Sequence, residues 1–454
     1  MAGTYLTRST TTRTNDRKFT YSCWFKKSTT GTDEYLVINY EDANNRGYIA
    51  NGNTDKFIIY DKAGGTERLQ AESNFVLRDT SAWYHLVYSV DSTAGSNRVK
   101  FYINGVDRYS DFTVTTAMSQ NVEVGFQKGV VSNGFKIGSQ ESGAANFNGL
   151  MSHVNFVDGL QLDASAFGQY DANGVWTIKT SPTVSEYGNN GFFILKNSGS
   201  KTDQSGKGNN FSEEGTPGIV SNTQDNPSNV FATLNPLVKP NDYTLSQGNN
   251  TIAYGSASTR ACCLSTLGMS SGKFYAELKV TASSTSPCQA SVGITNQSDN
   301  GQLGYYPNQG GTNQAAAYQF WDGNKNISQV GATYGATVAA NDIMGFAFDI
   351  DNKAMYVSKN GVWQGSGVPT SGASKTNAID FSSITDNGFW FLIIGDGSGV
   401  QTFTSSFNFG NGYFGTTAVA TNSGNGYAGA EGKSIFNYQP PTGYSALSTR
   451  GLNE

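Results

Sequence analysis

The segment Asn341–Trp363, with the sequence NDIMGFAFDIDNKAMYVSKNGVW, constrains the fold more than any other part of the chain. Phe346, Phe348 and Ile350 alternate with small or acidic residues, and a period of two is typical of a strand that is buried on one face. A short polar turn leads into a second strand. Asn360-Gly361 then closes the unit, because Asn and Gly tolerate the positive φ of a tight turn. The segment therefore predicts an antiparallel sheet, and none of its side chains is chemically reactive.

The composition favours the same kind of structure along the whole chain. Of the 454 residues, only 14% are charged, 13% are aromatic and 54 are glycine. Short strands with tight turns fit this composition better than helical bundles do, and the length fits two domains. A net charge of -5 gives no reason to expect a nucleic acid or an anionic membrane as a partner. The sequence has no run of 18 apolar residues, so we expect no membrane insertion.

Basic residues gather at the start of the chain. Asp16 is their one acidic neighbour within the first 27 residues. This stretch is either a solvated end or a segment that docks onto an acidic partner. The basic residues are Arg8, Arg13, Arg17, Lys18, Lys26 and Lys27.

The four cysteines do not form a disulfide framework. Cys262 and Cys263 are adjacent and cannot easily bond each other, and Cys23 stands alone in the first half. Together with Cys288, they predict free thiols and folding in a reducing cytoplasm. The first residues lack the apolar core of a signal peptide. We therefore expect the protein to stay inside a cell, or to leave it by lysis or as part of a particle.

The first half contains a series of aromatic strand patterns over residues 1–170. The pieces are FTYSCWFK, WYHLVYSVD, RVKFYINGV, and FKIGS followed by FNGLMSHVNFVDGLQL. In order and spacing they resemble the laminin-G-like branch of the concanavalin A-like sandwich family. The following pieces, FVDGLQLDASAFGQYDANGVW, GFFILKNSGS, DQSGKGNNF and DNPSNVFATLNPL, resemble a module of marine bacteriophage proteins. The resemblance implies a laminin-G-like domain with a phage-type extension over residues 1–215.

Four of the ten prolines lie between residues 216 and 240. Proline removes a hydrogen-bond donor and stiffens the backbone, so we expect an extended connector over residues 216–240. The prolines are Pro217, Pro227, Pro236 and Pro240.

The second half resembles a SPRY domain over residues 241–415. The matching pieces are GKFYAEL, VGI, YQFWDGNK, the segment Asn341–Trp363, FWFL and FNFG. The tail, residues 416–454, ends with PPTGYSAL, which resembles the close of SPRY-bearing phage proteins and implies packing back onto this domain. The expected fold is all-β, with two concanavalin A-like antiparallel β-sandwich (jelly-roll) domains in tandem.

Patterns that would carry catalysis are weak. Glucanases with this fold need two carboxylates a few residues apart on one strand, and the sequence lacks Glu-x-Asp-x-x-Glu. Asp349 and Asp351 stand where SPRY domains carry a turn-forming pair, so we expect a structural role. Residues 268–272 fit G-x-S-x-G, but His85 and His153 both precede the serine and a strand follows it. We predict that the protein is not an enzyme.

Cofactor patterns are equally weak. Residues 410–415 and 424–429 fit G-x-G-x-x-G, but neither segment follows a strand and opens a helix. The two histidines do not form a zinc pattern. Many laminin-G-like domains hold calcium through loop oxygens, which Asp91, Asn97 and Asp107 could supply, although all three are also ordinary turn residues. We predict no cofactor and leave calcium open.

With catalytic and cofactor patterns weak, the remaining function is the binding of a ligand. Sandwich folds suit this function because they carry variable loops at the ends of their sheets. Sugars stack on aromatic rings and hydrogen-bond to Asn, Asp and Gln side chains. Tyr305 and Tyr306 occupy a turn-rich loop, and neighbouring residues on a strand point to opposite faces, so we expect one to be exposed. Trp321, Asp322 and Trp363 flank turns that lie nearby in the layout of the SPRY family. Burial of both tryptophans in the core is the alternative.

These observations predict a non-enzymatic structural protein of a phage particle, in a fibre or surface appendage. Its partners would be other virion proteins and a glycan or protein of the host surface, and its location the virion, assembled in the host cytoplasm. By analogy with phage fibres we expect a homotrimer. The alternatives are a purely architectural capsid or tail decoration, and a glycan depolymerase with an unrecognised acid pair.

Overall fold

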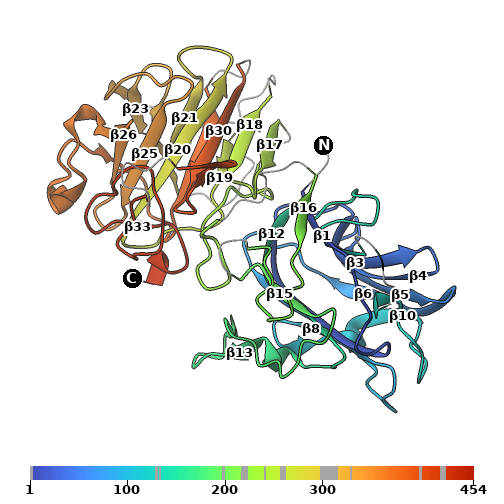
Figure 1. The fold of residues 1–454 in the computed structure, drawn as a ribbon. Coiled ribbons are helices and arrows are strands. Elements are labelled where there is room, and N and C mark those ends of the chain that lie inside the picture. Colours follow the sequence, from blue (N-terminus) through green and yellow to red (C-terminus); the bar gives the residue numbers. More distant parts are fainter. Residues whose placement is uncertain are drawn as a thin grey trace. The chain divides into compact units, whose positions relative to one another are not determined.

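β-strands make up almost half of the molecule and helices very little of it (Figure 1). The structure is a computed structural model that describes residues 4–127, 131, 134–196, 200–215, 223–239, 242–255, 262–296, 315–327, 330–397, 401–419 and 426–453. Its 46% strand and 5% helix confirm the predicted all-β class of antiparallel sandwiches. The chain divides into two units, residues 1–222 and 223–454.

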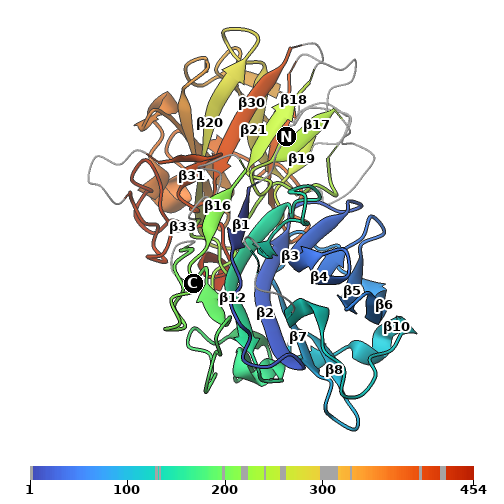
Figure 2. The same cartoon turned by 45° about the vertical axis from the view of Figure 1, so that its right-hand side comes forward.

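The first unit contains an eight-stranded and a six-stranded antiparallel sheet. Figure 2 shows β12, β2, β7 and β8 of the smaller sheet side by side. The larger sheet is, in order, β10 (Phe112–Thr116), β6 (Thr66–Val76), β5 (Lys56–Ala63), β4 (Asn45–Asn51), β3 (Glu34–Asp42), β11 (Phe135–Ile137), β1 (Tyr5–Arg8) and β16 (Ser212–Glu214). The smaller sheet is β15 (Phe192–Ile194), β12 (Gly149–Asp158), β2 (Lys18–Lys27), β7 (Tyr84–Asp91), β8 (Val99–Ile103) and β9 (Val106–Asp107), and a separate hairpin pairs β13 (Gly168–Tyr170) with β14 (Trp176–Ile178).

The core of the first unit lies between these two sheets, because side chains alternate along the strands. On β5, Phe57 and Ile59 are buried, whereas Tyr60 points outward and is half-buried. From the other sheet, β2 directs Phe19 and Phe25 into the same core. The rings of Phe25 and Phe57 lie 5.9 Å apart between centroids, which joins the two sheets directly.

Residues 159–187 cover the other face of the six-stranded sheet. Val87 of β7 and Val157 of β12 point to this face and form a second apolar cluster with Ala166 and Phe167. Apart from Val87, the buried residues of this cluster belong to the pieces from which the phage-type extension is expected. This sheet is therefore buried on both faces over part of its area.

The second unit is also built on two sheets, with nine and six strands. The larger one runs through β17 (Tyr243–Ser246), β18 (Thr251–Tyr254), β30 (Phe403–Asn408), β20 (Lys273–Ser283), β25 (Ile343–Asp349), β26 (Ala354–Lys359) and β27 (Val362–Trp363), with β28 (Ile379–Asp380) paired to β26 and β33 (Ser445–Ala446) paired to β20. The smaller one is β19 (Cys262–Leu264), β29 (Phe391–Asp396), β21 (Ala290–Thr295), β22 (Ala315–Gln319), β23 (Asn324–Ile327) and β24 (Val330–Thr333), and a hairpin pairs β31 (Tyr413–Phe414) with β32 (Thr417–Ala418).

The helices of the described chain are short 3₁₀ turns, and none of them is long and apolar enough to cross a membrane. They are η1 (Tyr109–Asp111), η2 (Gly125–Gln127), η3 (Ala164–Ala166), η4 (Gln364–Ser366), η5 (Pro369–Ser374) and η6 (Gly451–Asn453).

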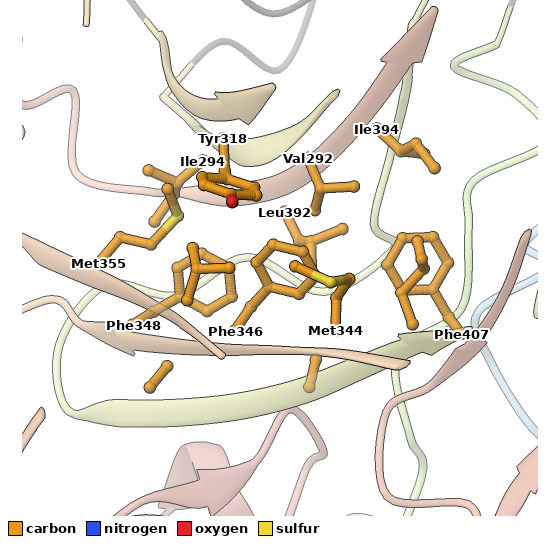
Figure 3. Packing of buried hydrophobic residues seen from close by; sticks show 14 of the residues in the cluster. Val292, Ile294, Tyr318, Met344, Phe346, Phe348, Met355, Leu392, Ile394 and Phe407 are labelled. Carbon is orange, nitrogen blue, oxygen red and sulfur yellow. The ribbon is translucent and has the colours of Figure 1, made fainter. Parts of the chain in front are cut away.

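The segment Asn341–Trp363 forms β25, β26 and β27, as its pattern predicts. Phe346 and Phe348 are buried, and the turn at Asn360 and Gly361 has φ angles of 49° and 82°. Figure 3 shows both phenylalanines inside the core between the two sheets. Their neighbours in that view are Val292, Ile294, Tyr318, Met344, Met355, Leu392, Ile394 and Phe407.

The outward face of β25 is buried, whereas the sequence predicted a strand that is buried on one face only. Ala347 and Asp349 are fully buried as well. Ala347 is paired across the sheet with Tyr275, and the ring of Tyr275 packs edge-on against Phe436 with 4.9 Å between centroids. The C-terminal segment, residues 426–453, therefore covers this face, and β33 within it adds a parallel pairing to β20.

Part of the expected connector over residues 216–240 belongs to the second unit. Phe231 and Leu234 are buried in its core, and Phe231 forms a β-bridge with Ser448 of the C-terminal segment. Proline does not prevent this pairing, because the residues that form the bridges lie between the prolines. Residues 223–239 are thus packed into the second unit, with turns closed by Asn226 and Asn229 and by Asn235 and Val238.

The basic residues near the start do not form a solvated end. Arg8, Lys26 and Lys27 are buried, and Lys18 pairs with Asp91 at 2.9 Å. Charged side chains become buried when their charged ends find partners inside the fold. The expectation of a solvated end is therefore wrong for these residues, because strands β1 and β2 lie inside their sheets.

All four cysteines are free and buried, which confirms the expected absence of a disulfide framework. Burial raises the pKa of the Cys23, Cys262 and Cys263 thiols to about 12. Such thiols are protonated at neutral pH and unreactive, so they act as small apolar side chains.

Candidate functional site

The five predicted ligand-binding residues are divided between several loops. Tyr305 and Tyr306 lie outside the described residues, so their contact with a ligand stays a prediction. Trp321 and Asp322 follow β22, and Trp363 ends β27. The six-stranded and the nine-stranded sheet of the second unit therefore each contribute to the set.

Asp322 organises the turn between β22 and β23. Its carboxylate accepts hydrogen bonds from the main-chain N of Asn324 at 3.0 Å and from Asn324 Nδ2 at 2.9 Å. Gly323 takes a φ of 71°, which glycine adopts without strain. Because Asp322 is exposed and a carboxylate can accept about four hydrogen bonds, it keeps acceptor capacity for a ligand.

The turn just described meets the loop after β27 at one corner of the sandwich. The main-chain N of Gly335 donates to Gly323 O at 2.8 Å, and that of Ala336 donates to Gln364 Oε1 at 3.0 Å. Gln364 directly follows Trp363, so residues from both sheets converge here. We call Asp322, Asn324, Trp363 and Gln364 the corner site.

The two predicted tryptophans are half-buried, between the two alternatives that the sequence left open. The ring of Trp321 lies so close to Gly397 that a Cβ on this glycine would overlap it. The Trp363 side chain packs against the core of the second unit. Trp363 directly precedes Gln364 of the corner site in the chain, whereas the ring of Trp321 packs at Gly397.

Asp349 and Asp351 hold the hairpin of β25 and β26, as the sequence predicted. Asp349 is fully buried, accepts hydrogen bonds from Asn352, and pairs with Lys273 at 3.4 Å. Asp351 accepts the main-chain N–H of Gly272 at 2.8 Å. Asp349 therefore holds the turn of its own hairpin, whereas Asp351 connects that hairpin to the residue before β20.

The candidate calcium ligands do not converge. Asp91 lies at the end of β7, where its main-chain N donates to Arg98 O, whereas Asp107 pairs with Tyr102 further along β8. Four residues of strand span about 13 Å, which is too far for one ion. The Asp91 carboxylate is also occupied by Lys18, and the structure groups no three His, Cys, Asp or Glu side chains as a metal site within the described residues.

The glycine patterns noted in the sequence are next to strands where the structure describes them. The G-x-S-x-G segment, 268–272, leads directly into strand β20, and both histidines lie in the first unit. Residues 410–415 follow β30 and contain β31, so no helix follows the glycines there. Residues 424–429 begin outside the described residues.

His85 lies on the outer face of the six-stranded sheet of the first unit, between two tryptophan rings. Its imidazole stacks on Trp24 at 4.8 Å and on Trp176 at 5.9 Å between centroids. Trp176 Nε1 donates to His85 Nδ1 at 3.0 Å, so the ring hydrogen is on Nε2, which donates to Ser22 Oγ at 2.9 Å. Trp176 comes from β14, and this contact holds the extension onto the sheet.

We expect His85 to remain neutral, with its hydrogen on Nε2, between pH 5 and pH 8. Burial, helped by the charge of His153, lowers the pKa of His85 to about 3. Because the unfolded chain takes up a proton near pH 6.5 and the folded chain does not, His85 lowers the stability of the first unit as the pH falls below about 6.5. Long-range ¹H–¹⁵N NMR spectra would report both tautomer and charge. A titration midpoint near 6.5 would contradict the assignment, and Trp176→Phe, which removes the donor to Nδ1, is the control.

The comparison with protein families agrees with the architecture of the first unit. Residues 2–163 match a laminin-G-type family model that is described as the concanavalin A-like lectin/glucanases superfamily. They form a concanavalin A-like domain. This confirms the resemblance expected from the strand patterns of the first half. A comparison with curated proteins gave no match.

Several solved structures are similar to parts of the chain. The SPRY domain of human HERC1 has a TM-score of 0.31 and 12% identity, with 38% of this chain and 96% of that chain covered. Another human SPRY domain has a TM-score of 0.26 and 17% identity, with coverages of 36% and 94%. A putative carbohydrate binding protein from Bacteroides ovatus has a TM-score of 0.32 and 16% identity, with coverages of 47% and 56%.

Proposed function

We propose that the protein is a non-enzymatic structural component of a bacteriophage particle, in a fibre or surface appendage, and that it recognises a glycan or protein of the host surface. The observation that carries the binding role is the match of residues 2–163 to a superfamily of lectins and glucanases. The phage context rests on the resemblance of the pieces between residues 156 and 237 to a module of marine phage proteins.

Several features support binding over catalysis. Asp349, one of the closely spaced pair singled out from the sequence, is buried and accepts hydrogen bonds from Asn352 of its own hairpin, and Asp351 accepts the main-chain N–H of Gly272. The corner site offers an exposed carboxylate, amide groups and a half-buried aromatic ring, which suit hydrogen bonds to sugar hydroxyls and contact with a sugar face. No cofactor enters this proposal.

Single sugar contacts are weak, with a Kd near 1 mM, or about -4 kcal/mol. Several linked copies raise the overall avidity by roughly 10²–10⁴-fold without any new contact. The proposal therefore includes a homo-oligomer, a trimer by analogy with phage fibres, that assembles in the host cytoplasm with other virion proteins and functions in the virion.

Binding of the fluorescently labelled full chain to host cells tests this proposal. We expect saturable binding that cell-surface polysaccharide competes away, and about tenfold weaker binding after Asp322→Ala, because multivalency amplifies the loss of one contact. Asp107→Ala, which changes an exposed aspartate of the first unit, is the matched control.

Three outcomes would count against parts of the proposal. Absence of binding to every host that the parent particle infects would overturn recognition and favour the purely architectural alternative. Unchanged binding of Asp322→Ala would exclude the corner site as the contact with the host ligand, but it would not contradict host recognition itself. Release of reducing sugar from the host polysaccharide would show the depolymerase alternative.

A further inference from the structure

A polar pocket of ≈ 330 Å³ opens in the first unit between β1 and the loop that precedes β16. This volume is at the lower end of the range of about 300–1,000 Å³ for small-molecule sites. Apart from Thr7, its walls are Arg8, Ser9, Gly208, Asn209, Asn210 and Ser212. Part of this wall comes from the loop 203–210, which lies beyond the residues that match the family model. The pocket is therefore a feature that the extension adds to the sandwich.

The sheet creates the pocket because β16 is shorter than the strand beside it. Thr7 pairs with Ser212 at the first residue of β16, and the preceding residue, Phe211, turns into the core. The main-chain N of Phe211 donates to Lys201 O at 3.0 Å. Beyond this point Arg8 and Ser9 face the loop 203–210 instead of a paired strand, and the space between them is the pocket.

The loop wall is held rigidly by Asn209. Its Nδ2 donates to Asn189 O at 2.9 Å and to Gly191 O at 2.7 Å, and its main-chain N donates to Asp203 Oδ2 at 2.9 Å. The next residue, Asn210, accepts the main-chain N–H of Asp203 at 2.8 Å through its Oδ1, which leaves the hydrogens of its Nδ2 for a ligand. A wall that is already ordered loses little conformational entropy when a ligand binds.

Arg8 supplies a buried donor group to the opposite wall. Its side chain and backbone are only 6% exposed, and the guanidinium donates to Asn190 O at 2.8 Å and to Asn209 Oδ1 at 2.7 Å. A guanidinium carries five N–H groups, so these two contacts leave donors for further acceptors. Nη1 and Nη2 each carry two N–H groups and use one of them here, so a ligand in the pocket can accept from the others.

The charges around the pocket favour a neutral ligand. Two carboxylates lie one residue behind Arg8: Asp158 accepts the main-chain N–H of Asn190 and Asp203 that of Asn209, and an oxygen of each of these asparagines accepts from the guanidinium. The Asp203 carboxylate accepts main-chain N–H groups of Phe193 and Ser205 as well as that of Asn209. An anionic ligand would meet this excess of negative charge, whereas hydroxyl groups can both donate to and accept from the amide, hydroxyl and guanidinium groups of the walls.

We propose that the pocket formed by Arg8, Ser9, the loop 208–210 and Ser212 binds a neutral sugar residue. The inference rests on the proposed recognition function and names a second contact for it, in the first unit. None of the residues that line the pocket is aromatic, so hydrogen bonds rather than ring stacking provide the selectivity. A single site of this kind has a Kd of about 1–10 mM, which a multivalent particle would amplify.

Titration of the full-length protein with free sugars, followed by saturation-transfer NMR, tests the pocket. The probes are D-glucose, D-galactose, D-mannose and N-acetyl-D-glucosamine, with D-glucuronate as the acidic counterpart. Ser212→Trp fills the pocket from an exposed strand position where an aromatic residue is well tolerated. Ser246→Trp makes the same change at an exposed position of β17, which is also the outer strand of its sheet, and is the matched control.

We expect at least one neutral sugar to bind the wild type and Ser246→Trp equally, and Ser212→Trp at least about tenfold more weakly, because the new side chain occupies the pocket. Ser9→Trp, from the opposite wall, should repeat the loss and covers the case in which Ser212→Trp fails to fold. Binding of none of the neutral sugars, binding of D-glucuronate alone, or equal binding by both pocket variants would overturn the proposal.

The same variants separate this proposal from the proposed function. If wild type and Ser212→Trp adsorb to host cells equally and bind neutral sugars equally, the pocket is excluded and recognition stands. If no host cell binds the wild type but Ser212→Trp abolishes sugar binding, the pocket stands and host recognition is excluded.

Discussion

Replacing Glu277 with alanine should destabilise the second unit by roughly 3–5 kcal/mol, because buried hydrogen-bond donors lose their acceptor at about 1–3 kcal/mol each. Glu277 lies on β20 and is fully buried. Its carboxylate accepts the main-chain N–H groups of Asn437 at 2.8 Å and Tyr438 at 2.7 Å, and the side-chain amide of Asn408 at 3.2 Å. The substitution therefore releases the C-terminal segment from the sheet that it covers.

The stability of the second unit should also depend on pH through the titration of Glu277. Burial raises the pKa of Glu277 to about 7, although its hydrogen bonds lower it. The folded state thus holds a proton more tightly than the unfolded chain, whose carboxyl group titrates near 4.3. The stability that this group contributes is present below about pH 4.3 and is lost as the pH rises through 7. Glu277→Gln, which cannot titrate, should remove this dependence.

Hydrogen exchange measured peptide by peptide at increasing urea would resolve the second unit from the first. In Glu277→Ala, peptides from residues 426–453 and from β20 should exchange at lower urea, while peptides of the first unit should not change. Glu72→Ala, at an exposed position of β6, is the control, with an expected effect within about 0.5 kcal/mol. A loss below about 1 kcal/mol in Glu277→Ala would mean that the carboxylate does not hold the segment.

The sequence predicted those features that depend on short-range patterns. The alternation around Phe346 and Phe348 and the tight turn at Asn360-Gly361 placed β25, β26 and β27 correctly. The alternation could not show that the second face of β25 is also buried. That face is covered by Phe436 and its neighbours, which are almost 90 residues further along the chain.

The candidate site was predicted less completely, for the same reason. The sequence selected Asp322 and Trp363, but the hydrogen bonds through Gly335 and Ala336 that bring their loops together follow from the pairing of distant strands. Arg8 was read as one of several basic residues at the start of the chain. Its partners follow it by about 180 and 200 residues, so no local signal distinguished it from a solvated charge.

The second large effect concerns a buried charge in the first unit. Lys27 was also read as part of the basic start of the chain, yet its side chain is 1% exposed and its Nζ lies 3.1 Å from Asp55 Oδ1. Asp55 also accepts the main-chain N–H of Gly31 and the Nε–H of Arg78, both at 2.8 Å. Burial alone would raise the pKa of Asp55, but these hydrogen bonds outweigh it and hold the pKa below its ordinary value. Asp55 therefore stays ionised beside the buried ammonium group.

Asp55→Asn should destabilise the first unit by about 3–5 kcal/mol, because it leaves the Lys27 ammonium buried without this counter-charge. Asparagine suits the test, since it keeps the size of the side chain and tolerates the φ of 64° at this position. The double variant Lys27→Met/Asp55→Asn should recover part of the loss, since a buried pair replaced by uncharged groups costs less than a broken pair. If the second substitution restores stability, the loss in Asp55→Asn comes from the unpaired buried charge, because a general loss of packing would not be reversed by a further substitution.

Peptide-resolved hydrogen exchange at increasing urea, applied to β2 and β5, would measure both variants. Asp107→Asn, at an exposed position, should stay within about 0.5 kcal/mol of the wild type. Equal destabilisation of the single and double variants would show that the lost hydrogen bonds to Gly31 and Arg78, and not the unpaired charge, set the cost. Because the carboxylate of Asp55 must be ionised to balance Lys27, the wild type should also lose this stability as the pH falls through the lowered pKa of Asp55, whereas the double variant should not.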